Sequence, residues 1–139
     1  MKTRLIAYIT TLVVLLTLDA IWLVTVAGST YRQAIGHLML ERPNFIAAAL
    51  FYAVYVVGIL VFAVMPALRS GQLTFALTHG ALFGFFAYLT YDMTNLSTLK
   101  GWPLWLAALD TVWGTVLTAA AASGGFLLTR LFTGRELVP

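Results

Sequence analysis

The sequence predicts an all-α membrane protein, an antiparallel bundle of four transmembrane helices with a short amphipathic interfacial helix in the first loop. Of its 139 residues, 61% are hydrophobic and only 9% are charged, whereas soluble domains carry about 25% charged residues. The apolar runs have no polar stripe, so they could not form the water-facing helices of a soluble protein. We therefore expect a single transmembrane domain over residues 1–139.

Four apolar segments are long enough to cross a membrane. A hydrocarbon core about 30 Å thick needs about 20 helical residues. The segments that meet this length are residues 5–27, 45–65, 73–93 and 104–132. Pro66 is expected to end the second segment, and the short turn that follows makes a helical hairpin of the second and third.

The first loop is expected to contain a helix over about residues 30–42. Ser29 and Thr30 are both suited to cap its start, and Pro43 ends the run. Its apolar residues recur at helical spacing on one face: Tyr31, Ile35, Leu38 and Met39. This pattern is typical of a helix that lies on a membrane surface.

The positive charges favour one orientation of the bundle. Five lie in the N-terminus, the second loop and the C-terminus: Lys2, Arg4, Arg69, Arg130 and Arg135. Three lie in the first and third loops: Arg32, Arg42 and Lys100. Since cytoplasmic loops carry the excess of Lys and Arg, both termini are expected in the cytoplasm.

A cleaved signal peptide is the alternative interpretation of the N-terminus. Residues 1–4 are basic, residues 5–18 are apolar, and Thr25-Val26-Ala27 resembles a small-residue cleavage site. Cleavage would leave three helices. The apolar character continues past Asp19 to Ala27, which favours an uncleaved first span.

Several functional classes have no support in the sequence. The chain has no cysteine, which excludes disulfides, thiolate metal sites and cysteine nucleophiles. The net charge of +3 follows the ends of the spans and does not indicate a nucleic-acid partner. His37 and His79 lie at different expected depths, so we expect no metal site, and no phosphate loop or haem motif indicates a cofactor. None of the serines has a matched base and acid: Ser29, Ser70, Ser97 and Ser123.

Small residues mark where the helices touch. Gly80 and Gly84 form a GxxxG pattern in the third span, and the fourth span contains Gly114, residues 119–122 and Gly124. Small residues let helices approach closely in lipid, where packing drives association. Packing inside one bundle and a homo-oligomer face are the two interpretations.

Three of the five acidic residues lie in spans: Asp19, Asp92 and Asp110. A carboxylate at the helix centre costs about 2.5 to 3.5 kcal/mol on insertion scales, so each needs a partner or a role. At 1.5 Å per residue, Asp19 lies about 12 Å and Asp110 about 9 Å below the outer ends of their spans, with Asp92 at the outer rim. All three are therefore expected in the outer half of the membrane.

Spacing groups these aspartates with other polar and aromatic residues. The sequence contains two Asp-x-x-Trp pairs, Asp19 with Trp22 and Asp110 with Trp113. In each pair, the two side chains lie on one side of their helix. We expect the first and fourth spans to flank a common outward cleft. The candidate ligand-binding residues are Asp19, Trp22, Arg32, Tyr88, Asp92, Asn95, Lys100, Asp110 and Trp113. Trp102, Trp105 and Tyr91 are expected to form an interfacial aromatic belt.

These motifs resemble the bacterial membrane family of unknown function DUF2177. The resemblance runs over nearly the whole chain and rests on Asp19-Ala-Ile-Trp22, Phe51-Tyr52 with Tyr55, Tyr91-Asp92-Met-Thr94-Asn95, Lys100 with Trp102-Pro103, and Asp110 with Trp113-Gly114. It implies a multi-pass protein of the bacterial inner membrane with an uncleaved first span. It implies no activity.

Three functions fit these features. The favoured one is an outward-facing polar pocket that binds a small or amphipathic ligand, in lipid modification or as an accessory to it, among membrane lipids. A structural or assembly subunit, in which the aspartates only hold the fold, is the first alternative. A proton-coupled transporter acting as a homo-oligomer is the second, because two carboxylates held close together favour binding of a proton. Whether the protein is an enzyme stays open.

Overall fold

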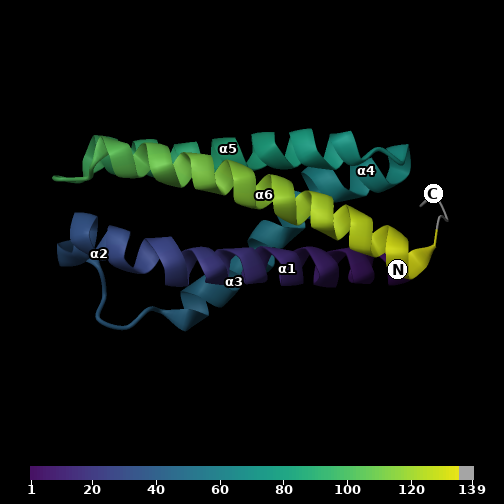
Figure 1. Ribbon diagram of the computed structural model, residues 1–139, viewed down its shortest axis with the longest axis horizontal. Helices are drawn as coiled ribbons and strands as arrows, with labels where there is room; N and C mark the ends of the chain where they lie inside the picture. The colour runs from purple at the N-terminus through teal and green to yellow at the C-terminus, as the bar shows by residue number, and fades with distance from the viewer. Residues whose placement is uncertain (135–139) are drawn as a thin grey trace.

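The computed structural model describes residues 1–134 as a bundle of long helices (Figure 1). Four are long and apolar enough to cross a membrane: Lys2–Leu38, Phe45–Ser70, Leu73–Thr98 and Leu104–Thr133. Within residues 1–134 there is no strand. The expected all-α architecture with four spans is confirmed. Arg135, one of the charges used for the orientation, lies outside the described residues.

The first helix is longer than expected because the loop helix continues it. α1 (Lys2–Trp22) leads through a π-helical turn, η1 (Leu23–Ala27), into α2 (Gly28–Ile35) and a short 3-10 turn, η2 (Gly36–Leu38). Ser29 and Thr30 do not cap a new helix, because the backbone is already helical where α2 begins. The amphipathic helix is present, but it ends at Leu38, short of the expected residue 42.

The second helix also continues past its expected end. It consists of α3 (Phe45–Ile59), a π-helical turn, η3 (Leu60–Val64), and α4 (Met65–Ser70). Proline lacks an N–H, and its ring clashes with the carbonyl four residues earlier. The wider turn of η3 directly precedes Pro66 and relieves both problems. The expected stop at Pro66 is therefore wrong, and the helix ends at Gly71, whose φ is 70°.

Glycines hold α5 (Leu73–Thr98) directly against α6 (Leu104–Thr133). A methyl group on Gly84 would overlap the carbonyl oxygen of Gly114 and the side chain of Thr118. A methyl group on Gly80 would lie 2.8 Å from Cβ of Ala122. The GxxxG pattern thus serves packing inside the bundle.

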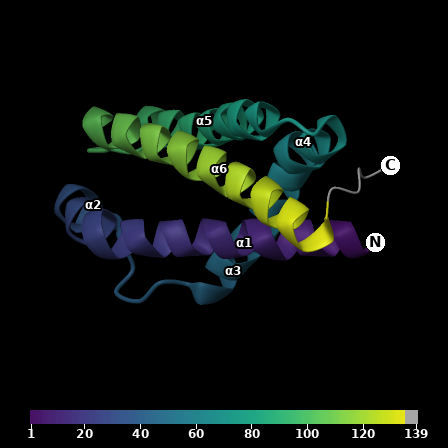
Figure 2. The same ribbon diagram turned by 45° about the vertical axis from the view of Figure 1, so that its right-hand side comes forward.

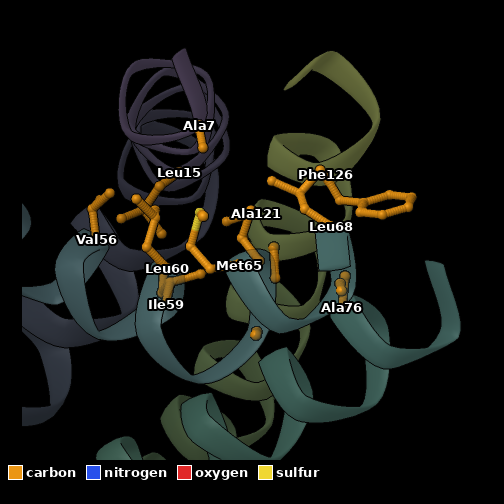
Figure 3. Packing of buried hydrophobic residues seen from close by; sticks show 14 of the residues in the cluster. Ala7, Leu15, Val56, Ile59, Leu60, Met65, Leu68, Ala76, Ala121 and Phe126 are labelled. Carbon is orange, nitrogen blue, oxygen red and sulfur yellow. The ribbon is translucent and has the colours of Figure 1, made fainter. Parts of the chain in front are cut away.

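The bundle is closed at one end and wedge-shaped at the other. α5 and α6 lie side by side, and α6 approaches α1 near the start of the chain but diverges from it toward α2 (Figures 1 and 2). The apolar core fills the closed end (Figure 3). It includes Ala7, Leu15, Val56, Ile59, Leu60, Met65, Leu68, Ala76, Ala121 and Phe126. Large apolar side chains elsewhere are exposed, among them Leu5, Leu50, Phe86 and Leu131, as expected for a surface that faces lipid.

Replacement of Gly84 by alanine should destabilise the bundle. The added methyl group forces α5 away from α6, and overpacking of this kind costs about 1–3 kcal/mol. Gly36→Ala is the matched control, because its methyl group would meet only the Arg32 side chain at 3.6 Å. The midpoint of thermal unfolding in a nonionic detergent should fall for Gly84→Ala and stay or rise for Gly36→Ala. Equal midpoints would show that the close approach of α5 and α6 does not limit stability.

Candidate functional site

Asp19 joins three helices through its two carboxylate oxygens. The carboxylate lies on α1 and is 9% exposed. The Tyr52 hydroxyl of α3 donates a hydrogen bond to Oδ2. The indole N–H of Trp113, on α6, donates to Oδ1 over 3.3 Å. Both oxygens therefore have partners, and the group holds α1, α3 and α6 together.

Asp110 has a different environment. It lies on α6 and is 8% exposed. The Tyr31 hydroxyl of α2 donates a hydrogen bond to Oδ1. Among the side chains of residues 1–134, none donates a hydrogen bond to Oδ2. One oxygen of a buried carboxylate is thus left to accept from something else.

The π-helical turn η1 explains why Tyr31 reaches Asp110. An α-helix turns about 100° per residue, so the twelve steps from Asp19 would leave Tyr31 about 120° away from it around the axis. A π-helical turn accommodates one extra residue without adding its rotation, which reduces the difference to about 20°. Both residues consequently face the same side of the first helix. The position of this turn beside the site fits the frequent occurrence of π-helical turns at functional sites.

A cavity of about 260 Å³ lies in the wedge between these groups. We call it the aspartate cavity. Trp22 of α1 and Trp113 of α6 stack beside it, with ring centroids 4.3 Å apart and planes at 7°. Its lining residues are Asp19, Trp22, Leu23, Ala27, Gly28, Tyr31, Met39, Tyr88, Asp110 and Trp113. The two Asp-x-x-Trp pairs therefore meet at one cavity between the first and fourth helices.

A second cavity of about 310 Å³ lies between α3 and α5. We call it the lateral cavity. Its lining residues are Phe51, Tyr55, Ala87, Tyr88, Tyr91 and Asp110. Phe51 and Tyr91 are 47% and 55% exposed, so this cavity reaches the outer surface of the bundle. Tyr88 and Asp110 line both cavities.

Tyr88 and Tyr55 are fixed by small and polar groups of α6. The ring of Tyr88 occupies the space that a side chain at position 114 would need, so Gly114 is required for its position. The Tyr55 hydroxyl lies 2.8 Å from Oγ1 of Thr118. Because Thr118 donates its own proton to the Gly114 carbonyl over 2.7 Å, Tyr55 is the donor in that pair. The wall between the two cavities is therefore held rigidly on α6.

A family comparison covers this whole site. The family model DUF2177, described as a predicted membrane protein, matches residues 4–127. The chain belongs to the DUF2177 family. The matched range includes both cavities and every residue that lines them. No curated protein and no solved structure matches the chain.

Asp92 lies outside both cavities of this DUF2177 chain. It is fully buried between α5 and α6, where Oγ1 of Thr111 donates to its Oδ2 over 3.5 Å. Within residues 1–134, its buried Oδ1 and the buried indole N–H of Trp102 have no hydrogen-bond partner. The expected group of three aspartates around one cleft is therefore reduced to two. The reason is direction around the helix: Tyr91, one residue earlier, lines the lateral cavity, whereas Asp92 points about 100° farther round α5 and is buried against Thr111.

Other expected site residues are also placed away from the cavities. Arg32 and Lys100 are exposed, and Asn95 is half-buried, but none of the three lines either cavity. The hydrogen bonds to the aspartates come from tyrosine, tryptophan and threonine instead of these cations.

The aromatic belt is only partly as expected. Trp105 and Tyr91 are 53% and 55% exposed, whereas Trp102 is 8% exposed. Trp102 packs with Ile35, Leu106 and Ala107. The expectation for Trp102 is wrong, because the long first helix brings Ile35 over it.

Tyr31, Tyr52 and Tyr55 are the site residues absent from the expected list. Each hydroxyl bonds a polar group on another helix. Tyr52 and Tyr55 belong to the motifs by which the chain resembles its family, and they lie three apart in a span without charge. That spacing puts both hydroxyls on one face, and it is the signal that could have identified them.

Deletion of Val24 should leave the site intact. Val24 lies in η1 and is 85% exposed, so its removal turns the π-helical turn into ordinary α-helix and keeps Tyr31 on the face of Asp19. Deletion of Val13, which is 54% exposed in regular α-helix, is the control. It should rotate the first half of α1 by about 100° and remove Ala7 from the core.

The two deletions can be compared by the yield of monodisperse protein on size-exclusion chromatography and by the unfolding midpoint. We expect near-normal values for the Val24 deletion and little folded protein for the Val13 deletion. Equal damage by both would contradict the role given to η1.

Proposed function

We propose that the protein binds an amphipathic molecule from the surrounding membrane. The polar head would lie in the aspartate cavity and the apolar chain would leave through the lateral cavity. The observation that carries this proposal is that Tyr88 and Asp110 line both cavities. One molecule can therefore contact Asp110 with its head and the aromatic side chains of α3 and α5 with its chain.

The chemistry of the aspartate cavity favours a polar head. Ligand sites are commonly concave, mostly apolar, and supplied with a few convergent polar groups. Here two buried carboxylates meet among indole and phenol rings. Since a carboxylate in the membrane needs a partner or a role, the unpartnered Oδ2 of Asp110 supports a role in binding.

The lateral cavity favours an apolar chain. Phe51, Tyr55, Ala87 and Tyr91 supply its apolar walls, and the neighbouring side chains of α3 that face outward are apolar and exposed. A molecule that already lies in the bilayer would reach Asp110 from the side, without passing through water.

The two cavity aspartates would have different tasks. Asp19, with both oxygens occupied, acts mainly as a connection between helices. Asp110, with one oxygen that no described side chain bonds, is the group that faces the ligand. This division separates the proposal from a purely structural role, in which both carboxylates would be equally occupied.

We further propose that the cavities lie in the outer half of a bacterial inner membrane. Lys2, Arg4, Arg69 and Arg130 gather at the closed end of the bundle, away from both cavities. Because cytoplasmic sides carry the excess of Lys and Arg, this distribution supports a wedge that faces the outside.

Single cysteines test this orientation, because the chain has none of its own. Ser97→Cys lies at the end of α5 near the wedge, and Ser70→Cys lies at the end of α4; both serines are exposed. A membrane-impermeant maleimide should label Ser97→Cys in intact cells and Ser70→Cys only after permeabilisation. The reverse pattern would place the cavities on the cytoplasmic side.

Replacement of Asp110 by asparagine should remove the bound amphiphile. The change keeps the size of the side chain but removes the charge, whereas Asp92→Asn makes the same change outside both cavities. Met39→Trp, at a position 43% exposed that lines the aspartate cavity, should block the space without changing any charge.

Mass spectrometry of amphiphiles that purify with each variant is the measurement. One species should be present with the wild type and Asp92→Asn, and depleted with Asp110→Asn and Met39→Trp. Circular dichroism of each preparation shows that the compared proteins are folded. The same amphiphiles in all four preparations would contradict the proposed function.

A further inference from the structure

We propose that the head group bound in the aspartate cavity is a cation, an ammonium group of an amphipathic amine. This inference rests on the proposed function and names the chemical class of its ligand. It is carried by the combination of an aromatic wall with two buried carboxylates whose hydrogen-bond donors within residues 1–134 are all neutral.

The charge balance of the cavity is the first argument. Asp19 and Asp110 both line it, and their donors are two phenols and one indole, all uncharged. Within residues 1–134, no lysine or arginine lines the aspartate cavity. Buried charges are stable when they are paired, so an empty or anion-filled cavity leaves the negative charge uncompensated. A ligand with one positive charge supplies a partner for one of the two carboxylates.

The unoccupied acceptor is the second argument. Asp110 is 92% buried, because 8% of its surface is exposed, and its Oδ2 receives no hydrogen bond from the described side chains. An ammonium N–H bonded to a carboxylate oxygen makes a charge-assisted hydrogen bond, which is about twice as strong as a neutral one. A phosphodiester or an ionised carboxylate head has only acceptors to offer at this position and would be repelled.

The aromatic wall is the third argument. Trp22 and Trp113 stack at 4.3 Å, and Tyr31 and Tyr88 complete the lining. Cations are attracted to the electron-rich faces of tryptophan and tyrosine rings, most strongly where water is excluded. Aromatic cages are a known means by which proteins recognise quaternary ammonium groups.

The test uses amphiphiles with the same ten-carbon chain and different heads. Decylammonium, decyltrimethylammonium and decyl sulfate are added at equal fractions to the purified full-length protein in a nonionic detergent. The midpoint of thermal unfolding is measured against probe concentration for the wild type, Asp110→Asn, Met39→Trp and Asp92→Asn.

Decylammonium should raise the midpoint of the wild type and of Asp92→Asn. In Asp110→Asn the concentration needed for the same rise should increase by about tenfold or more, because one charge-assisted hydrogen bond is lost. Met39→Trp should show the same loss, although its charges are unchanged. A response to decyltrimethylammonium with the same dependence on these variants also supports a cationic head.

Two results would overturn the inference, and they differ in what they leave standing. A rise caused by decyl sulfate alone, lost in Asp110→Asn and Met39→Trp, would show that the cavity binds an anion and would leave the proposed function intact. The second result is that no probe gives a response that depends on position 110 or 39, and that the same amphiphiles purify with every variant. It would contradict both the cationic head and the proposed function.

Discussion

The rest of the structure depends on one constraint, the close approach of α5 and α1 to two sides of α6. Toward α5, Gly114 and Thr118 meet Gly84 almost backbone to backbone. Toward α1, a methyl group on Gly125 would overlap the side chain of Thr11. Helices in lipid gain no hydrophobic free energy from burying apolar faces, so such close packing must hold them together. α6, with small residues at these contacts, is the central helix around which the others are arranged.

The cavities follow from this packing. Because Gly114 has no side chain, the Tyr88 ring lies against α6 and forms the wall that both cavities share. Four residues earlier on the same helix, Asp110 borders the same two spaces. The contact that stabilises the bundle and the surface that we propose for binding are therefore consecutive turns of one helix.

The sequence predicts the spans and the two Asp-x-x-Trp pairs on the sides of their helices, because hydropathy and i, i+3 spacing are properties of single helices. It does not predict that the hydrogen bond runs between the pairs, from Trp113 to Asp19. It does not predict the helix ends, since hydropathy marks the apolar part of a helix while hydrogen bonding continues to Leu38.

The position of Tyr31 depends on an irregular turn that no periodicity reveals. The depth of Asp92 in its span predicts that it joins the cleft, but depth does not fix the direction in which its side chain points. Packing between helices, which brings Thr111 to Asp92, decides that direction.

The length of the first helix sets the depth at which a ligand would meet the protein. At 1.5 Å per residue, the 37 residues of Lys2–Leu38 extend about 55 Å, well beyond the 40–45 Å of a whole bilayer with its head groups. If Lys2 lies at one hydrocarbon boundary, Trp22 lies about 30 Å away, at the other boundary. Asp19 then lies just inside the hydrocarbon, and Tyr31, about 14 Å beyond Trp22, lies past the head-group layer. A lipid could therefore present its head group to the aspartates near the depth that it has in the bilayer, without moving a charge into the hydrocarbon core.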